Sequence, residues 1–63
     1  MGKYLAKIYL EDDEIEDNSG DDIDELYAWM LVRAEGKFGS VHGEIIDSKS
    51  NKVVRQFRKT PPD

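Results

Sequence analysis

The sequence contains no cysteine and only one histidine in its 63 residues. A disulfide framework is therefore excluded, and so is a zinc site built from Cys and His ligands. There is also no apolar run of the length that a signal segment or a membrane helix needs, so we expect a cytoplasmic protein. A domain of this length buries only about 60% of the surface that its unfolded chain exposes, so it must rely on close packing or self-association.

Lys and Arg are absent from one long stretch, EDDEIEDNSGDDIDE, which spans residues 11–25. This stretch holds ten of the fourteen carboxylates, whereas the rest of the chain holds all nine Lys and Arg residues and only four acids. The charge is thus bipolar along the sequence, although the net charge is −5. Apolar residues outside the stretch fall into periodic blocks, which indicates a folded core rather than a disordered chain.

Periodicity predicts one helix and three strands. Residues 3–10 and the segments VHGEII and KVVRQFR have the alternation and the branched or aromatic content of strands, and the polar DSKSN turn joins the last two. The helix has one buried stripe at i, i+3, i+4 spacing, formed by Ile23, Leu26, Tyr27, Met30, Leu31 and Ala34. We expect Ser19, Asp21 or Asp22 to cap its N-terminus and Gly36 to end it as a left-handed C-cap.

This order predicts a single α+β domain over residues 1–59, a β-α-β-β fold in which one helix packs on a three-stranded sheet. Within it, residues 11–21 are expected to form an acidic loop, and residues 60–63 to form a flexible C-terminal tail. If the first two strands pair in parallel, the crossover through the helix should be right-handed. The second face of the sheet is then left open, and dimerisation is one way to cover or extend the sheet.

The acidic stretch has two simple explanations. Acids at the helix start interact favourably with the helix dipole, by about 0.3–1 kcal/mol each, and the remaining acids can be solvated surface. Metal binding is the second explanation, but the spacing does not fit a calcium loop. With Gly20 at the sixth loop position, Ile15 and Leu26 would occupy the first and last ligand positions. We therefore predict no metal site.

A protein partner with a basic surface is the function that we favour from the sequence. Duplex DNA carries one negative charge per about 1.7 Å of its axis. An acidic loop and helix start can approach that density of charge, and can therefore attract the Lys and Arg side chains of a nucleic-acid-handling protein. Small acidic inhibitors that are carried by phages and other mobile elements offer an analogy from charge alone. Trp29 lies outside the helical stripe and either anchors the partner or packs against the loop or the hairpin. The predicted partner-binding residues are Asp12, Asp13, Glu14, Glu16, Asp17, Asp21, Asp22, Asp24, Glu25 and Trp29.

The basic C-terminal hairpin supports an alternative function, nucleic-acid binding. Proteins usually bind single-stranded nucleic acid with a groove of basic side chains and an aromatic side chain on which a nucleobase stacks. Phe57 is the available aromatic, but it alternates with Val53 and is expected to face the core. The acidic stretch would also repel phosphate. The candidate residues for this alternative are Lys52, Arg55, Arg58 and Lys59.

No residue pattern indicates catalysis. His42 is expected to face solvent from a strand, and no nucleophile elbow accompanies it. The glycine-containing residues 36–40 lack the spacing of a phosphate-binding loop and precede a strand rather than a helix. We therefore predict a protein that is not an enzyme, with no catalytic residues and no cofactor.

Overall fold

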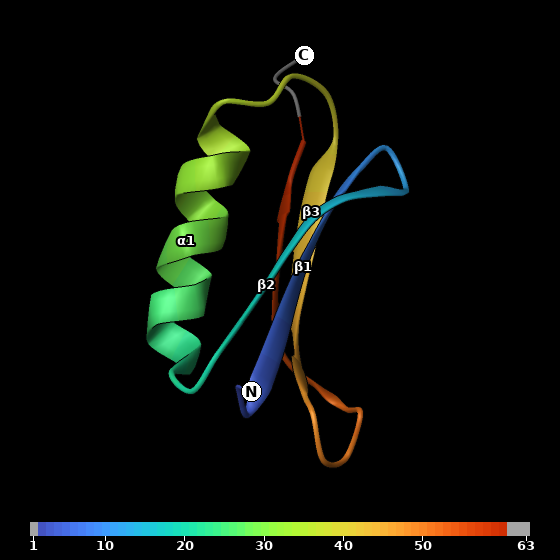
Figure 1. Ribbon diagram of the computed structural model, residues 1–63. Coiled ribbons are helices and arrows are strands. Elements are labelled where there is room, and N and C mark those ends of the chain that lie inside the picture. Colours follow the sequence, from blue (N-terminus) through green and yellow to red (C-terminus); the bar gives the residue numbers. More distant parts are fainter. Residues whose placement is uncertain (1, 61–63) are drawn as a thin grey trace.

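The computed structural model describes residues 2–60 and has one helix packed on a four-stranded sheet (Figure 1). Its elements are β1 (Tyr4–Leu10), β2 (Asp13–Gly20), α1 (Ile23–Glu35), β3 (Val41–Asp47) and β4 (Val53–Lys59). The expected small α+β fold is confirmed, and the sheet order is β2-β1-β3-β4 with every neighbouring pair antiparallel. Most of the predicted tail, residues 61–63, lies outside the described residues.

The predicted acidic loop is wrong, because residues 13–20 form the edge strand β2. It pairs with β1 from Tyr4 opposite Gly20 to Leu10 opposite Asp13. Only Glu16 and Gly20 within β2 are even partly buried. The strand therefore lacks the apolar alternation from which a strand is predicted, since its pairing depends on backbone hydrogen bonds that leave no mark on side-chain type.

The three-stranded sheet is also wrong, and the condition for a parallel crossover, parallel pairing of the first two predicted strands, is not met. Because β2 reverses the chain before the helix begins, α1 connects β2 to β3, which run in the same direction on either side of β1. The second predicted strand is β3, which pairs with β1 antiparallel from Tyr4 opposite Asp47 to Leu10 opposite Val41. The C-terminal hairpin of β3 and β4 is confirmed.

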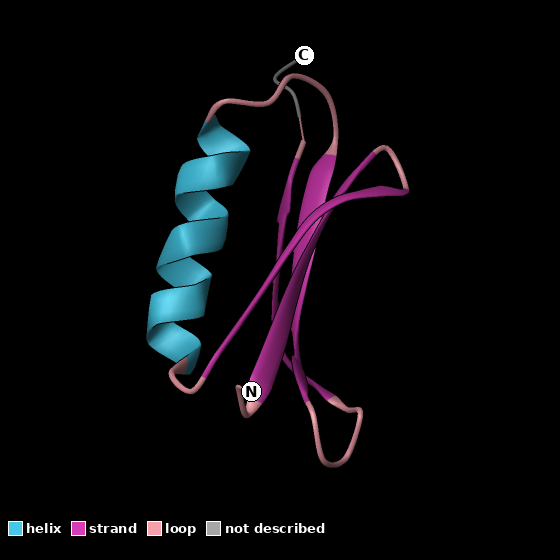
Figure 2. Cartoon of the chain, in the orientation of Figure 1, coloured by secondary structure: helices cyan, strands magenta, loops and turns pink. Residues whose placement is uncertain are grey.

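The core lies between α1 and one face of the sheet, and α1 covers this face alone (Figure 2). The opposite face carries no helix or other element of residues 2–60. Strand β1 contributes small and branched residues to the core, and α1 contributes residues one turn apart. The buried hydrophobic residues are Ala6, Ile8, Leu26, Met30, Ala34, Val41 and Ile45.

The buried stripe of the helix is shifted from its predicted position. Leu31 was expected to be buried but is 40% exposed, whereas Trp29 packs against the core. Strand β2 explains the shift, because it widens the sheet on one side of α1. The flank of the helix that carries Trp29 and Arg33 lies toward that strand, where Arg33 pairs with Glu16.

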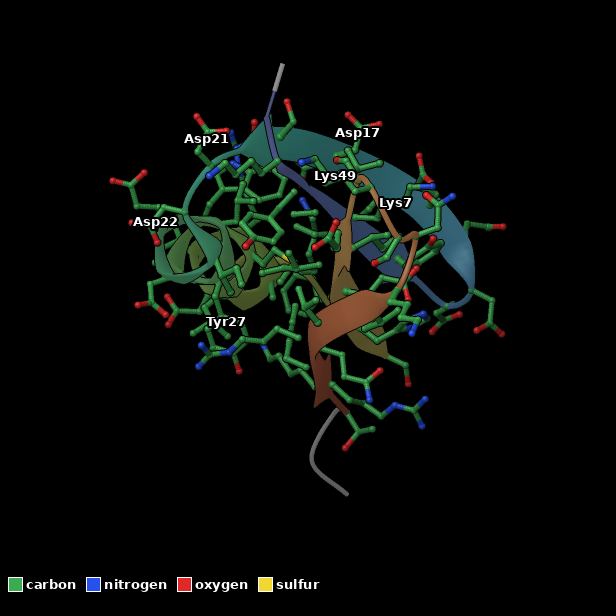
Figure 3. All side chains as sticks on the ribbon, turned by 90° about the horizontal axis from the view of Figure 1, so that it is seen from below. Lys7, Asp17, Asp21, Asp22, Tyr27 and Lys49 are labelled. Carbon is green, nitrogen blue, oxygen red and sulfur yellow. The ribbon has the colours of Figure 1, made fainter. Side chains whose placement is uncertain are left out.

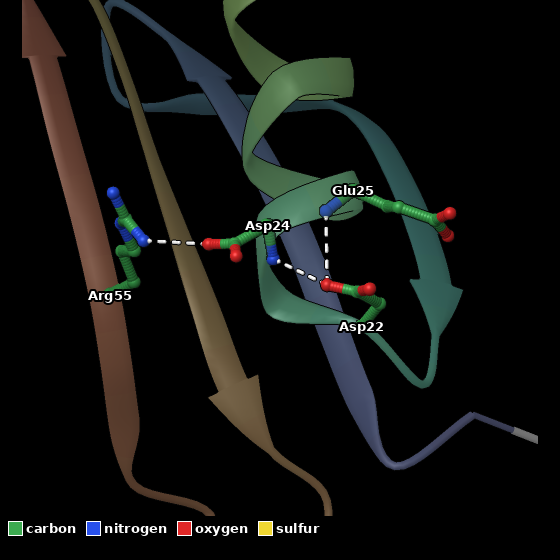
Figure 4. Close-up of polar contacts among 4 residues, drawn as sticks. All are labelled: Asp22, Asp24, Glu25 and Arg55. Atoms are coloured by element: carbon green, nitrogen blue, oxygen red, sulfur yellow. Dashed lines mark hydrogen bonds and ion pairs between the residues drawn. The ribbon is translucent and has the colours of Figure 1, made fainter.

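Side chains cap both ends of α1. Of the three predicted N-caps, Asp22 fills the role, since its Oδ1 accepts the backbone N–H groups of Asp24 at 2.9 Å and Glu25 at 3.3 Å (Figure 4). At the other end, Gly36 is the C-cap that follows Glu35, as predicted, but its φ is −86°, so the predicted left-handed conformation is wrong. Lys59 instead donates from Nζ to the carbonyl oxygen of Ala34 at 3.2 Å, and a basic group there also complements the helix dipole.

Gly43 is the position where β3 lacks space for a side chain. It is buried and lies opposite Phe57 in the sheet. A Cβ atom on it would overlap Cε1 of Phe57 and lie 3.0 Å from Sδ of Met30. Phe57 therefore packs inward as predicted, over a glycine, and its ring meets that of Tyr27 edge-on at 6.2 Å between centroids.

We predict that Gly43→Ala lowers the free energy of unfolding by about 1–3 kcal/mol, because an overpacked core must shift its neighbours. In a domain of this size each kcal/mol corresponds to about 4–8 °C in Tm. Gly36→Ala is the matched control, since its Cβ would meet only the carbonyl oxygen of Arg33, at 3.9 Å. Urea unfolding followed by circular dichroism measures both variants, and equal stabilities would contradict the packing described for Phe57.

Candidate binding edge on strand β2

Strand β2 is one edge of the sheet, and β4 is the other. An edge strand presents a row of backbone N–H and C=O groups without partners, which can accept a further strand unless charges or bulges prevent it. The β2 edge carries acidic side chains, whereas Arg55, Arg58 and Lys59 lie on β4. The bipolar charge of the sequence thus becomes a separation of charge across the sheet.

Three of the predicted partner-binding carboxylates pair with bases of the same molecule. Glu14 lies 3.6 Å from Nζ of Lys7, on the face of the sheet away from α1. Asp24 lies 3.2 Å from Nη1 of Arg55, so it joins the helix start to β4 (Figure 4). The Asp24 side chain is 88% exposed, so this pair contributes little to stability. Glu16 is the third, and it is the most enclosed.

Glu16 points toward α1 and receives two bases. Its Oε1 lies 3.6 Å from Nε of Arg33, and its Oε2 lies 3.2 Å from Nζ of Lys37. Oε2 is buried and accepts no hydrogen bond, so the nearby positive charge of Lys37 is what offsets the cost of burying it. The guanidinium of Arg33 also lies 5.9 Å from the centre of the Trp29 ring. Glu16 and Trp29 are therefore parts of the contact between β2 and the helix.

Two more of the predicted carboxylates fix the chain at the helix start. Asp22 is the N-cap, and Asp21 accepts the backbone N–H of Lys3 through Oδ1 at 2.9 Å. Figure 3 shows Asp21 and Asp22 together at the start of the helix, with Asp17 on the strand that precedes them. Both residues have structural roles, and their removal would disturb the fold as well as any binding.

Four of the predicted carboxylates remain exposed and make no ion pair or side-chain hydrogen bond within residues 2–60. Glu25 extends from α1 toward the side of β2, opposite to Asp24 (Figure 4). Asp17 lies on β2 across from Lys7, on the sheet face away from α1. The structure thus divides the predicted set, and we name its free part the acidic edge, which consists of Asp12, Asp13, Asp17 and Glu25.

The turn between β1 and β2 places two acidic residues in the left-handed backbone conformation, which non-glycine residues rarely adopt. Glu11 has φ 48° and Asp12 has φ 74°, and they are the two central residues of the hairpin, since Leu10 pairs with Asp13. Two-residue turns of this kind favour Asn-Gly, because both residues need positive φ. A left-handed conformation costs most residues, such as Glu, about 1–2 kcal/mol, although Asp adopts it more readily. Negative charge therefore sits at the tip of the hairpin despite a cost to stability.

Phe38 is an exposed aromatic that the sequence analysis did not place in the site. It is 94% exposed, in the loop between α1 and β3. The backbone N–H of Glu11 donates to the carbonyl oxygen of Ser40 at 2.9 Å, so this loop adjoins the hairpin tip. The signal in the sequence is a large apolar residue between two glycines, outside every periodic block. Trp29, the predicted anchor, is by contrast partly buried against the core.

The bases proposed for nucleic-acid binding do not form one free surface. Arg55 pairs with Asp24 and lies 4.1 Å from the centre of the Tyr27 ring, and Lys59 caps the helix. Lys52 and Arg58 are exposed and form no ion pair within the described part of the chain. Half of the predicted basic set is thus engaged with α1.

The open sheet face carries a small polar cluster around Tyr9. Its ring stacks on that of His42 at 4.8 Å between centroids, and its hydroxyl donates to Oε1 of Glu44 at 3.3 Å. Burial and the Glu44 charge raise the pKa of Tyr9 above its ordinary value of 10.0. The contacts of His42 on this face are with an aromatic ring rather than with a nucleophile.

Between Gly2 and Thr60, no three His, Asp or Glu side chains come together as a metal-binding group. No helix in the described range is long and apolar enough to cross a membrane. Comparisons with protein-family models, curated proteins and solved structures found no match.

We predict that replacing the hairpin tip by Glu11→Asn/Asp12→Gly stabilises the protein by about 1 kcal/mol or more, because Asn and Gly accept positive φ. Thermal unfolding measures the effect. The control Asp13→Asn/Asp17→Asn removes the same charge from residues that need no positive φ. An equal gain in both variants would attribute the effect to charge repulsion and contradict the backbone cost assigned to the tip.

Proposed function

We propose that the protein is a non-enzymatic binding protein whose acidic edge engages a basic surface on another protein. One observation carries the proposal: acids that the fold needs are paired or capping, whereas the acidic edge is exposed and has no partner within residues 2–60. An exposed strand edge also offers backbone hydrogen bonds to a partner. Charge and an open strand thus coincide at one place.

The spacing of the charges supports a partner that handles nucleic acid. A strand advances about 3.3 Å per residue, so the two free carboxylates of β2, Asp13 and Asp17, are separated by about 13 Å along the strand. One strand of duplex DNA presents one charge per 3.4 Å of axis. The separation of the two carboxylates equals about four phosphate steps, so a partner that reads phosphates with Lys and Arg can contact both carboxylates, which suggests an inhibitor or regulator that mimics nucleic acid.

Phe38 supplies an apolar contact with the partner, which the acidic edge cannot provide. Aromatic residues are enriched in the buried centres of interfaces, whereas rim charges chiefly raise the association rate and set its salt dependence. The hydrogen bond between Glu11 and Ser40 holds the Phe38 loop beside the acidic hairpin tip. We therefore assign the anchor role, first given to Trp29, to Phe38.

The first test is capture from cell lysate by the immobilised protein, with competing duplex DNA. We expect a basic nucleic-acid-handling protein to bind at low salt and to be displaced by high salt or by DNA. Asp13→Asn/Asp17→Asn should lose it, whereas Glu35→Lys, which changes the net charge equally at an exposed helix position, should retain it. Identical captured proteins with both variants would contradict the proposal.

The same eluates distinguish the alternative function. If the protein binds nucleic acid through its C-terminal hairpin, nucleic acid will be recovered with Asp13→Asn/Asp17→Asn and lost with Lys52→Glu/Arg58→Glu. These two bases are chosen because the fold does not use them in ion pairs within residues 2–60, unlike Arg55. That outcome would replace the proposed function.

We predict that Phe38→Ala weakens binding of the captured partner at least tenfold and leaves Tm unchanged, since the side chain makes little contact with its own fold. The expected loss corresponds to about 1.4 kcal/mol or more. Val32→Ala is the control, because Val32 is also exposed, at 69%, but lies on the helix. Isothermal titration calorimetry measures both, and equal affinities of the two variants would remove Phe38 from the interface.

A further inference from the structure

The two edges of the sheet carry charges of opposite sign. Within β2 the side chains of Asp13, Glu14, Glu16 and Asp17 are acidic, and within β4 those of Arg55, Arg58 and Lys59 are basic. Charged edges normally prevent one molecule from pairing with another. Repulsion between like charges disfavours pairing of β2 with β2 and of β4 with β4. Attraction between opposite charges favours pairing of β2 of one molecule with β4 of another.

Strand directions permit this pairing. Strand β4 runs opposite to β3 and β2 runs with β3, so β4 and β2 are antiparallel. A second copy moved sideways across the sheet, without being turned over, therefore places its β2 antiparallel to β4 of the first. The sheet is four strands, or about 19 Å, wide, which exceeds the helix diameter of about 10–12 Å. The two helices then lie on the same face without collision.

Both edges also expose apolar side chains and have a regular segment free for pairing. Ile15 on β2 is 39% exposed, and Val53 and Val54 on β4 are 48% and 44% exposed. Irregularities in the register lie beside Ile15 and Val54, which leaves residues 16–20 of β2 and 55–59 of β4 as regular runs of equal length. Pairing these runs would extend one continuous antiparallel sheet and cover apolar surface.

We infer that the acidic β2 edge binds the basic β4 edge of a second copy of this chain, head to tail. The contact is heterologous, because each copy keeps one free edge of each sign, so further copies can add to form a chain or a ring. It occupies the acidic edge of the proposed function, so self-association and capture of a basic partner exclude each other. The inference does not depend on that function, since purified protein alone tests it.

Sedimentation of the purified protein over a range of concentration and salt provides the test. We expect the weight-average mass to rise above twice the 7.2 kDa of one chain at low salt and high concentration, and to return to one chain at high salt. Asp13→Lys/Asp17→Lys and Lys52→Glu/Arg58→Glu should each stay monomeric alone, because the first variant cancels the net charge of its β2 edge and the second cancels that of its β4 edge, counted with the adjoining Lys52. Their mixture should form pairs, because the second variant keeps the acidic β2 edge and the first variant keeps the basic β4 edge.

A wild-type protein that remains monomeric throughout would overturn the inference, and so would a mixture that does not associate. If Asp13→Lys/Asp17→Lys loses its circular dichroism signal, since Asp17 faces Lys7, Asp13→Asn/Asp17→Asn replaces it and should associate at least tenfold more weakly than the wild type. Unchanged association of that variant would also overturn it. Self-association is measured as the mass of the purified protein and capture as the proteins recovered from lysate, so either proposal can fail while the other holds.

Discussion

The antiparallel pairing of β2 with β1 determines the rest of this structure. It turns the acidic stretch back along β1, so the chain enters α1 from the edge of the sheet and returns through β3 on the other side of β1. The helix is thereby held over the sheet, with Trp29 and Arg33 toward β2. Without this hairpin the same carboxylates would form a loop, and the sheet would have no acidic edge.

The acidic stretch combines two kinds of residue that look alike in the sequence. Asp22 and Glu16 stabilise the fold, one by capping the helix and the other by holding two bases between β2 and α1. Asp13 and Asp17 do neither within the described residues. A small domain has a stability of only about 0.05–0.15 kcal/mol per residue, so repulsion among such charges is a measurable cost. The binding role proposed for the acidic edge explains why these charges are present despite that cost.

The elements with an apolar face were predictable, and the element without one was not. Tyr4–Leu10, the helix and the C-terminal hairpin were recognised because burial imposes a period on their side chains. Strand β2 has no such period, and Glu11 and Asp12 replace the Asn-Gly signal that would have revealed its turn. Because β2 is not predicted, the predicted buried stripe of the helix includes Leu31, which is exposed, and omits Trp29, which packs against the core. The Asp22 cap was predictable because its signal is local.

Amide hydrogen exchange of residues 13–20, followed by nuclear magnetic resonance, tests the central claim most directly. If the acidic stretch is a strand paired with β1, amides at alternate positions of β2 will be protected, and nuclear Overhauser effects will join Ala6 to Asn18 across the pair. Exchange of every amide in this segment at the rate of an unstructured chain, without such contacts, would show a loop. There would then be no acidic strand edge for a partner or a second copy to bind.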